Sequence, residues 1–215
     1  MLKYILFDLD GTLTDPKEGI TKCVQYALKR FGIIRDCDEL LEFIGPPLME
    51  HFMEYANLSA DDGKKAVEYY RERYAPIGIF ENRIYDGVIP MLKTLKDKGY
   101  VLAVATSKPS VFAQKICDKY SISDYITYLS GSELDGRNTD KSIVIKKAID
   151  HLGATKDNTI MIGDRIYDLL GATENGIKSI AVTYGYAKEG EFETGECADV
   201  VSSPVEIITA IENFK

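Results

Sequence analysis

The sequence predicts an α/β fold: a doubly wound, mostly parallel sheet with a helical subdomain inserted after the first strand. From Tyr85 onward, short apolar runs alternate with helical patterns, which is typical of βαβ units with right-handed crossovers. Residues 16–80 carry helical patterns only. Three of the apolar runs also end in polar side chains that suit catalysis.

The first apolar run, Tyr4–Phe7, continues directly into Asp8, Asp10 and Gly11. A short apolar run followed by a turn signal predicts a buried strand. Residues two apart share one side of an extended chain, so we expect both carboxylates to face one site if the backbone stays extended to Asp10. Two like charges about 4 Å apart cost roughly 4 kcal/mol at an effective dielectric near 20. A bound cation or a shared proton would relieve that repulsion.

The segment that follows predicts a small helical domain. Apolar spacing indicates helices over residues 17–31, 38–44, 48–56 and 59–74. Gly32 and Gly45-Pro46-Pro47 act as stop signals, and Ser59 is an expected N-cap. Because Pro76-Ile77-Gly78 marks a return point, we expect a core domain of residues 1–15 and 81–215 and a helical domain of residues 16–80.

The remaining elements of the core alternate in type. Helices are expected from Asp86 to near Gly99, from Pro109 towards Tyr120, over residues 141–152, after residue 163 to near Gly176, and from Pro204 to Asn213. Strands are expected over residues 100–106, 125–129, 159–163, 178–182 and 199–201. The segment 185–195, rich in Gly and Glu, is expected to be a surface loop.

The net charge, apolar content and cysteines of the sequence argue against several classes of partner, location and metal site. The chain has 215 residues and a net charge of −8, which argues against nucleic acid or an anionic membrane as the main partner. No stretch approaches the roughly 20 apolar residues that span a bilayer, and no signal peptide is visible, so we expect a cytoplasmic protein. The four cysteines are Cys23, Cys37, Cys117 and Cys197. Their spacing is not that of a metal site, and the chain has only two histidines, so the sequence argues against a zinc site. We expect the cysteines to be buried thiols in a reducing compartment.

Polar residues follow three predicted strands: Asp8 and Asp10, then Thr106-Ser107-Lys108, then Asp164 and Asp168. Ends of neighbouring parallel strands meet at one edge of the sheet, where ligands bind. Clustered carboxylates suit Mg²⁺. One carboxylate can act as a nucleophile and form an aspartyl-phosphate, and another can act as general acid and base.

A phosphate that enters an acidic crevice needs cations and hydrogen-bond donors. Lys141, at the start of a predicted helix, is one candidate to neutralise the phosphoryl group, and Lys108 competes for that role. The hydroxyl of Thr106, with nearby backbone amides, can bind a phosphate oxygen. Arg165 and Tyr167 receive no role from the sequence.

With these motifs the sequence resembles the haloacid dehalogenase superfamily, as a phosphatase with a helical cap inserted after the first strand. Asp8-Leu9-Asp10-Gly11-Thr12 matches the first family motif. The resemblance implies that Asp8 is the nucleophile, that Asp10 is the general acid/base, and that Thr106 and Lys141 hold the phosphoryl group. It further implies that Mg²⁺ is bound by Asp8, the backbone carbonyl of Asp10 and Asp164, with Asp168 nearby.

Within that superfamily, Ile44-Gly45-Pro46-Pro47-Leu48 and Tyr85-Asp86-Gly87-Val88 resemble phosphoglycolate phosphatases and related 5′-nucleotidases. The resemblance implies a small-molecule phosphate ester as substrate, in a monomer or homodimer, and cap helices that exclude water. Phe43, Gly45, Pro46 and Leu48 are candidates to select the leaving group. The other candidate substrate-binding residues are Gly11, Thr12 and Ser107.

Three alternatives remain. A β-phosphoglucomutase-like sugar-phosphate mutase would keep Asp8 and Asp10 but protect the phospho-enzyme from water. A dehalogenase needs neither a metal nor an acid at position ten. A receiver-type signalling domain also gathers aspartates, a hydroxyl and a lysine at strand ends, but it lacks a long helical insert.

Overall fold

The computed structural model describes residues 1–214, apart from the side chain of Thr194. The chain folds as two compact units. Residues 1–15 and 84–215 form the sheet unit, and residues 16–83 form the helical unit. Lys215, the last residue of the core domain expected from the sequence, lies outside the described residues.

The sheet unit is built on a six-stranded sheet in the order β5-β4-β1-β6-β7-β8. All of its strand pairs are parallel, which confirms the predicted α/β class. The strands are β1 (Tyr4–Phe7), β4 (Val101–Pro109), β5 (Ile126–Ser132), β6 (Thr159–Gly163), β7 (Lys178–Val182) and β8 (Asp199–Val201). A two-stranded ribbon of β2 (Thr14–Asp15) and β3 (Arg83–Ile84) was not anticipated from the sequence.

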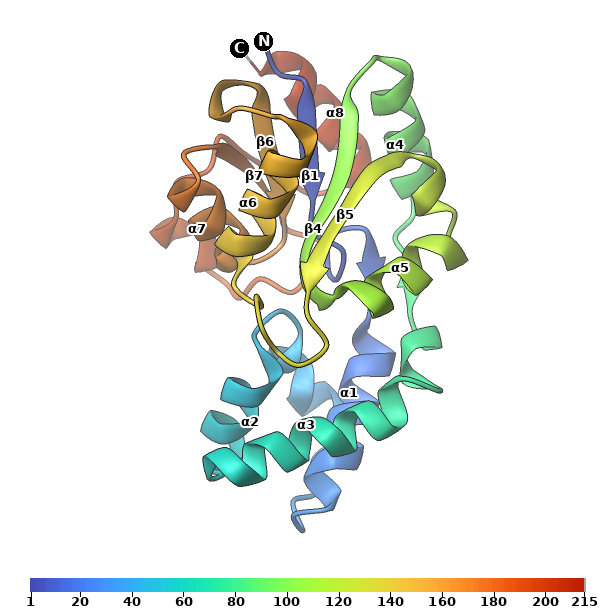
Figure 1. Ribbon diagram of the computed structural model, residues 1–215, viewed down its shortest axis with the longest axis vertical. Helices are drawn as coiled ribbons and strands as arrows, with labels where there is room; N and C mark the ends of the chain where they lie inside the picture. Colours follow the sequence, from blue (N-terminus) through green and yellow to red (C-terminus); the bar gives the residue numbers. More distant parts are fainter. Residues whose placement is uncertain (215) are drawn as a thin grey trace. The chain divides into compact units, whose positions relative to one another are not determined.

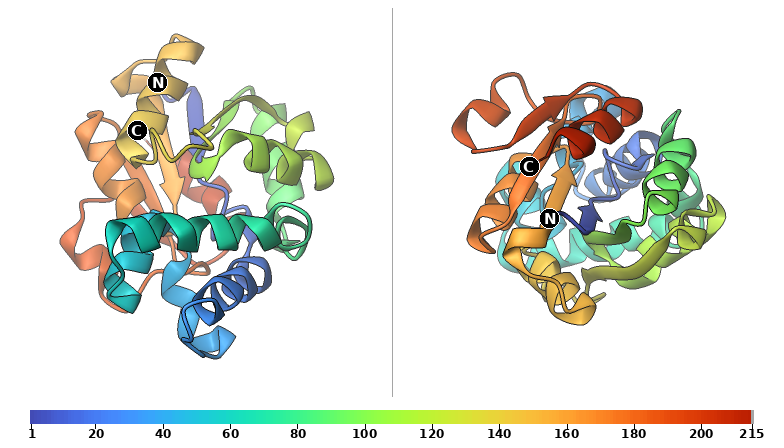
Figure 2. Two further views of the ribbon diagram at one scale, coloured as in Figure 1. Left: turned by 60° about the horizontal axis from the view of Figure 1, so that its bottom comes forward. Right: turned by 90° about the horizontal axis from the view of Figure 1, so that it is seen from above.

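Helices cover both faces of this sheet. Helix α6 contacts β4 and β5, and α7 contacts β6 and β7. Helices α4 and α5 also contact β4, α5 contacts β5 as well, and α8 contacts β8. Figure 1 shows α6 in front of the sheet and α8 behind it, and the right-hand view of Figure 2 places them on opposite sides of β1. The helices are α4 (Val88–Asp97), α5 (Ser110–Lys119), α6 (Lys141–Leu152), α7 (Ile166–Glu174) and α8 (Pro204–Asn213), with 3₁₀ turns η3 (Ile122–Asp124), η4 (Lys156–Asn158) and η5 (Glu191–Thr194).

The central strand β1 explains why this sheet forms. All four of its residues are buried, as expected for a strand covered on both faces. Leu6 lies opposite Ala103 of β4 and Met161 of β6. These three residues pack in one cluster with Val144 and Ile145 of α6, so the α6 side of the sheet is closed by aliphatic contacts.

Strand β1 ends at Phe7, where the predicted apolar run ends, and Asp10 makes an isolated bridge to Thr14. Other element ends differ from the sequence prediction. Strand β4 extends to Pro109. The expected helix start at Asp86 is wrong: α4 starts at Val88 and its N-cap is Gly87, whose φ of 89° favours glycine.

The helical unit holds α1 (Lys17–Lys29), η1 (Cys37–Phe43), α2 (Leu48–Ala56), α3 (Ala60–Tyr74) and η2 (Gly78–Phe80). Ser59 caps α3 as predicted and accepts a hydrogen bond from Asp62 N. Phe43 is fully enclosed by the rings of His51, Phe52 and Tyr55. This aromatic cluster forms the core between η1 and α2.

The cysteines fit their prediction only in part. All four are free thiols. Cys23 and Cys117 are buried, and burial raises the pKa of Cys117 to about 12. Cys37 and Cys197 are only partly buried, so the expectation of four buried thiols is wrong for these two. No helix within residues 1–214 is both long and apolar enough to cross a membrane.

We expect Leu6→Ala to lower the free energy of unfolding by about 2–5 kcal/mol, because the cavity would open in a packed aliphatic cluster. Urea denaturation followed by circular dichroism measures this change. Leu170→Ala is the matched control: Leu170 is 47% exposed on α7, and its truncation should shift stability by no more than about 0.5 kcal/mol. Equal losses in the two variants would contradict the assignment of Leu6 to the core.

Candidate active site

Three neighbouring strands bring the predicted polar residues to one edge of the sheet. Strand β1 lies between β4 and β6, with Phe7 opposite Val104 and Ile162. Asp8 follows β1 directly, and its N–H donates to the carbonyl of Ile162 at 2.9 Å. The carboxyl ends of β1, β4 and β6 therefore meet in the way the sequence predicted.

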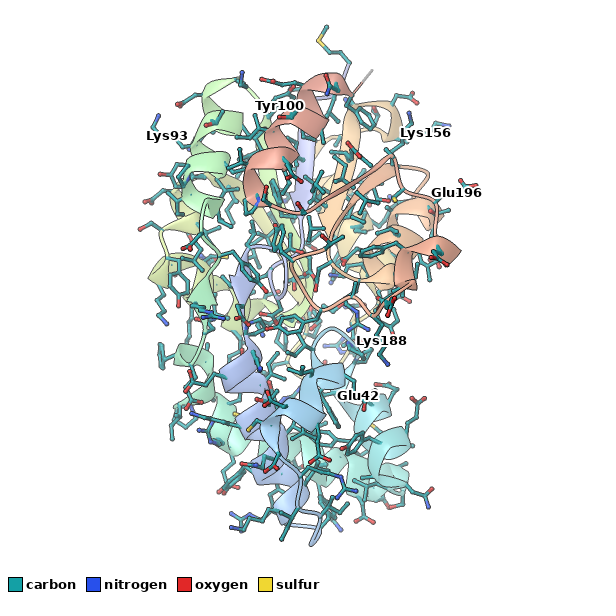
Figure 3. The ribbon with its side chains drawn as sticks, turned by 180° about the vertical axis from the view of Figure 1, so that it is seen from behind. Glu42, Lys93, Tyr100, Lys156, Lys188 and Glu196 are labelled. Carbon is teal, nitrogen blue, oxygen red and sulfur yellow. The ribbon has the colours of Figure 1, made fainter. Side chains whose placement is uncertain are left out.

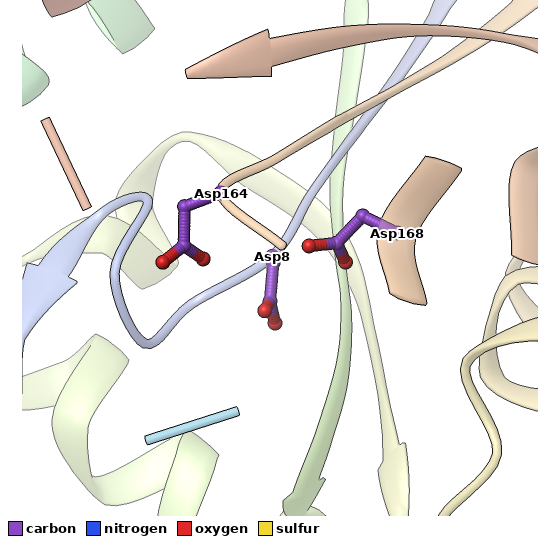
Figure 4. A group of neighbouring side chains, drawn as sticks. All are labelled: Asp8, Asp164 and Asp168. Carbon is purple, nitrogen blue, oxygen red and sulfur yellow. The ribbon is translucent and has the colours of Figure 1, made fainter. Parts of the chain in front are cut away.

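At this edge Asp8, Asp164 and Asp168 form an acidic cluster. One carboxylate oxygen from each lies within 4.8 Å of the others, and Figure 4 shows the three side chains around one space. Asp8 is 6% exposed, and the other two are fully buried. Such a concentration of buried like charge needs compensation.

Lys141 supplies part of that compensation. Its Nζ lies 2.9 Å from Asp8 Oδ1 and 2.9 Å from Asp168 Oδ1. Lys141 is the first residue of α6, which is capped by Asp140. Three carboxylates against one ammonium leave two negative charges in the cluster, which a divalent cation would neutralise.

Burial and charge shift the proton affinities of this cluster. Burial, together with the charges of Asp168 and Asp8, raises the pKa of Asp164 well above 3.8. Burial also raises the pKa of Asp168, to about 6, although Lys141 opposes the shift. For Lys141, burial lowers the pKa, but the two carboxylates outweigh it and the net shift is upward. Lys141 therefore keeps its positive charge, whereas burial disfavours the charged forms of Asp164 and Asp168.

Three glycines make room for the acidic cluster. A Cβ on Gly11 would lie 2.0 Å from Asp164 Oδ2, and one on Gly185 would lie 2.4 Å from Asp164 Cβ. A Cβ on Gly163 would lie 2.1 Å from Asp168 Cγ. Gly11 also has a φ of 85°, which side-chain-bearing residues rarely adopt. The absence of a side chain at these three glycines therefore leaves room for the carboxylates of Asp164 and Asp168.

Asp164 is held by a segment that the sequence did not single out. The backbone N–H of Tyr186 donates to Asp164 Oδ2 at 2.8 Å, and the Thr12 hydroxyl donates to Oδ1 at 3.4 Å. The hydroxyl of Tyr184 donates to the carbonyl of Thr12 at 2.9 Å, and that of Tyr186 donates to Asp15. The chain after β7 thus packs against the turn after β1. Spacing alone gave no signal for this packing, because the hydrogen bonds of the Tyr184 and Tyr186 hydroxyls span more than 170 residues.

Asp168 is positioned by the first turn of α7. Its Oδ2 accepts from the backbone N–H of Arg165 at 3.1 Å, so Arg165, and not Asp164, is the N-cap residue. The Arg165 guanidinium donates to Glu191 Oε1 at 2.9 Å, and Ile166 N–H donates to the same oxygen at 2.8 Å.

The segment 185–195 was expected from its composition to be a surface loop, but Glu191 attaches it to the start of α7. The side chains of Arg165 and Glu191 are only 7% and 9% exposed. Figure 3 labels Lys188 and Glu196, which precede and follow Glu191 in the sequence. The loop is therefore attached to the helix that carries Asp168, and Arg165 has a role that the sequence did not assign.

Asp10 is not a member of the three-carboxylate cluster and pairs with Lys108. Lys108 Nζ is 2.5 Å from Asp10 Oδ2. Burial raises the pKa of Asp10, and the nearby Lys108 opposes that shift. Thr106 is 2% exposed, and its Oγ1 accepts from Lys108 N–H at 3.3 Å. The two lysines thus have different carboxylate partners: Lys141 pairs with Asp8, and Lys108 pairs with Asp10.

The remaining candidate residues lie in three places. Ser107 is half-buried, and its carbonyl accepts from the Ser132 hydroxyl at 2.8 Å. Gly45 and Pro46 belong to the helical unit, where they are half-buried in the turn between η1 and α2. In the same unit Phe43 ends η1, and Leu48 starts α2.

The donor set of the acidic cluster fits a hard divalent cation. Its oxygens are all carboxylate oxygens from buried aspartates, the ligand class that Mg²⁺ prefers. Mg²⁺ binds through few protein ligands and keeps several waters, which matches a three-carboxylate site.

Comparison with known proteins agrees with this geometry. The family model described as "Haloacid dehalogenase-like hydrolase" matches residues 5–182. A 5′-nucleotidase of Pseudomonas aeruginosa is 45% identical over 208 residues, which cover 94% of each chain. A predicted phosphatase of Clostridium acetobutylicum, solved by crystallography, superposes with a TM-score of 0.96 at 43% identity over the whole of both chains. The tyrosine-protein kinase PtkA of Mycobacterium tuberculosis is 32% identical over 86% of this chain and 64% of its own length.

We expect Asp164→Asn to stabilise the metal-free protein at pH 8. Because the pKa of Asp164 is raised on folding, the folded state binds this proton more tightly than the unfolded state, so stability from this group falls as pH rises. Removal of the charge should therefore raise the free energy of unfolding by on the order of 1 kcal/mol at pH 8. The gain should shrink as the pH falls through the folded pKa towards 3.8.

Urea denaturation in the presence of a chelator, repeated between pH 8 and pH 4, measures this difference. Asp150→Asn on the exposed face of α6 is the matched control, because its side chain is 59% exposed, and it should show no comparable gain. A loss of stability in Asp164→Asn that is equal at both pH values would contradict the electrostatic account of the cluster.

Proposed function

This chain belongs to the haloacid dehalogenase-like hydrolase family, and from that premise we propose that it is a Mg²⁺-dependent phosphatase acting on a small phosphomonoester. The observation that carries the proposal is the buried cluster of Asp8, Asp164 and Asp168, in which Lys141 pairs with Asp8 and Asp168. A site with two uncompensated negative charges suits a divalent cation and, through it, an anionic phosphoryl group.

Mg²⁺ bound to Asp8, the carbonyl of Asp10 and Asp164 would act as a Lewis acid on the phosphoryl oxygens. Asp168 would contribute to the same site from α7. The Asp8 carboxylate is oriented by the Leu9 N–H at 2.7 Å and by Lys141 at 2.9 Å, both on Oδ1. This orientation presents Asp8 to the phosphorus as a nucleophile.

The proposed reaction has two steps. In the first, an oxygen of Asp8 bonds to phosphorus, the ester P–O bond breaks, and Asp10 gives its proton to the departing oxygen. In the second, Asp10 takes a proton from water as that water attacks phosphorus, and the bond to Asp8 breaks. Thr106 and Lys141 would hold the transferring group, with Gly11, Thr12 and Ser107 lining its site.

Nucleoside monophosphates are the first substrates to consider, because the Pseudomonas aeruginosa protein of 45% identity is named a 5′-nucleotidase. Phosphoglycolate is the second, from the sequence resemblance. The helical unit would serve as the cap that excludes water, and Gly45 and Pro46 with their neighbours would select the leaving group.

We expect Asp8→Asn to abolish phosphate release, because the amide lacks the nucleophilic carboxylate. Colorimetric phosphate release with Mg²⁺ and a panel of nucleoside monophosphates, phosphoglycolate and sugar phosphates measures this. Asp150→Asn is the matched control and should retain full activity, since this carboxylate pairs with Lys146 on the solvent face of α6. Activity retained by Asp8→Asn would remove Asp8 as the nucleophile.

We expect chelation of divalent ions to silence the protein and added Mg²⁺ to restore phosphate release. Full activity in excess chelator would exclude the metal-dependent mechanism. The same assay separates a phosphatase from a sugar-phosphate mutase: a phosphatase releases phosphate continuously, whereas a mutase keeps phosphate on the sugar.

A further inference from the structure

We propose that Lys108 is the positioning residue of the general acid: it binds Oδ2 of Asp10 and so keeps Oδ1 available to carry the proton to the leaving group. This inference rests on the proposed phosphatase function and assigns to Lys108 a task separate from the binding of the phosphoryl group.

The two oxygens of Asp10 have different surroundings. Oδ2 lies 2.5 Å from Lys108 Nζ. Oδ1 is buried and has no hydrogen-bond partner within residues 1–214. A buried polar atom without a partner costs free energy, and a catalytic role is one explanation for such an atom in a native structure. The asymmetry marks Oδ1 as the atom that meets the substrate.

The ion pair is well shielded from solvent. The side chain of Lys108 is 6% exposed and that of Asp10 is 13% exposed. At such exposure a charge pair is screened little by salt and holds its geometry better than a surface pair does. Loss of Lys108 would leave a buried carboxylate without its cation, which favours rotation of Asp10 away from its present position.

Lys108 reaches Asp10 because β4 and β1 are adjacent strands, about 4.8 Å apart. The backbone that carries Lys108 is itself fixed by the end of β5. The Ser132 hydroxyl donates to the carbonyl of Ser107 at 2.8 Å, and the Ser110 hydroxyl donates to the carbonyl of Ser132 at 3.3 Å. A Cβ on Gly131 would lie 2.7 Å from the carbonyl oxygen of Lys108, so the two strand ends approach more closely than a side chain would allow.

The two lysines of the site therefore divide the charges between them. Lys141 is committed to Asp8 and Asp168, which are the nucleophile and a candidate metal ligand. Lys108 is attached to the acid/base residue. If Lys108 acts through Asp10, its removal should affect proton transfer to the leaving group and leave phosphoryl binding intact.

The test compares two esters that differ in their need for a proton. An alkyl phosphate has a poor leaving group that requires general acid catalysis, whereas p-nitrophenyl phosphate has a good leaving group that departs without it. We expect Lys108→Met to lower kcat/KM for the alkyl phosphate by on the order of 10²-fold and for the aryl ester by only about 3-fold. The ratio kcat/KM reports the first chemical step, before water attacks the phospho-enzyme.

Further variants test whether Lys108 acts through Asp10. Lys108→Arg should recover much of the alkyl phosphate activity, because the guanidinium can still bind Asp10. Asp10→Asn should show the same preference for the aryl ester, and the double variant should lose little more than Asp10→Asn alone, since the two residues act as one unit. Lys146→Met on the exposed face of α6 is the matched control, and circular dichroism checks that each variant is folded.

Two outcomes would overturn the inference. An equal loss for both esters would mean that Lys108 binds the phosphoryl group, and no loss for either ester would mean that the ion pair has no part in the reaction. If the unmodified protein releases no phosphate from either ester with Mg²⁺, the proposed function fails before any substitution is made, and the inference fails with it.

Discussion

The mutual repulsion of Asp8, Asp164 and Asp168 is the constraint on which the rest of this site depends. Three carboxylates, which follow β1, follow β6 and lie on α7, share a buried space with the ammonium of Lys141. Such an arrangement costs stability unless a cation enters. The aliphatic packing of the parallel sheet around Leu6 supplies the rigidity that holds the charges together despite this cost.

Much of the fold could be predicted from the sequence because its signals are local. The apolar runs, the helical spacing and caps such as Ser59 act within a few residues, and the parallel sheet follows from their alternation. Likewise, the convergence of Asp8, Thr106 and Asp164 follows from strand ends that meet at one edge.

The parts of the site that could not be predicted depend on contacts between distant segments. Tyr186 holds Asp164, and Glu191 holds Arg165, yet nothing in the Gly- and Glu-rich composition around them distinguishes an anchor from an exposed loop. The partners of the two lysines were equally beyond reach. Sequence spacing placed both Lys108 and Lys141 near the crevice, but which carboxylate each one meets is decided by side-chain packing across strands.

The lack of side chains at positions 11, 163 and 185 bears on how this protein could diversify. Each α-carbon there sits so close to an aspartate that a single methyl group would collide with it. Random mutagenesis should therefore find these positions closed to every other amino acid, whatever substrate is used for selection. New substrate preferences would have to arise elsewhere, in residues that surround the leaving group, while the phosphorus chemistry stays as it is.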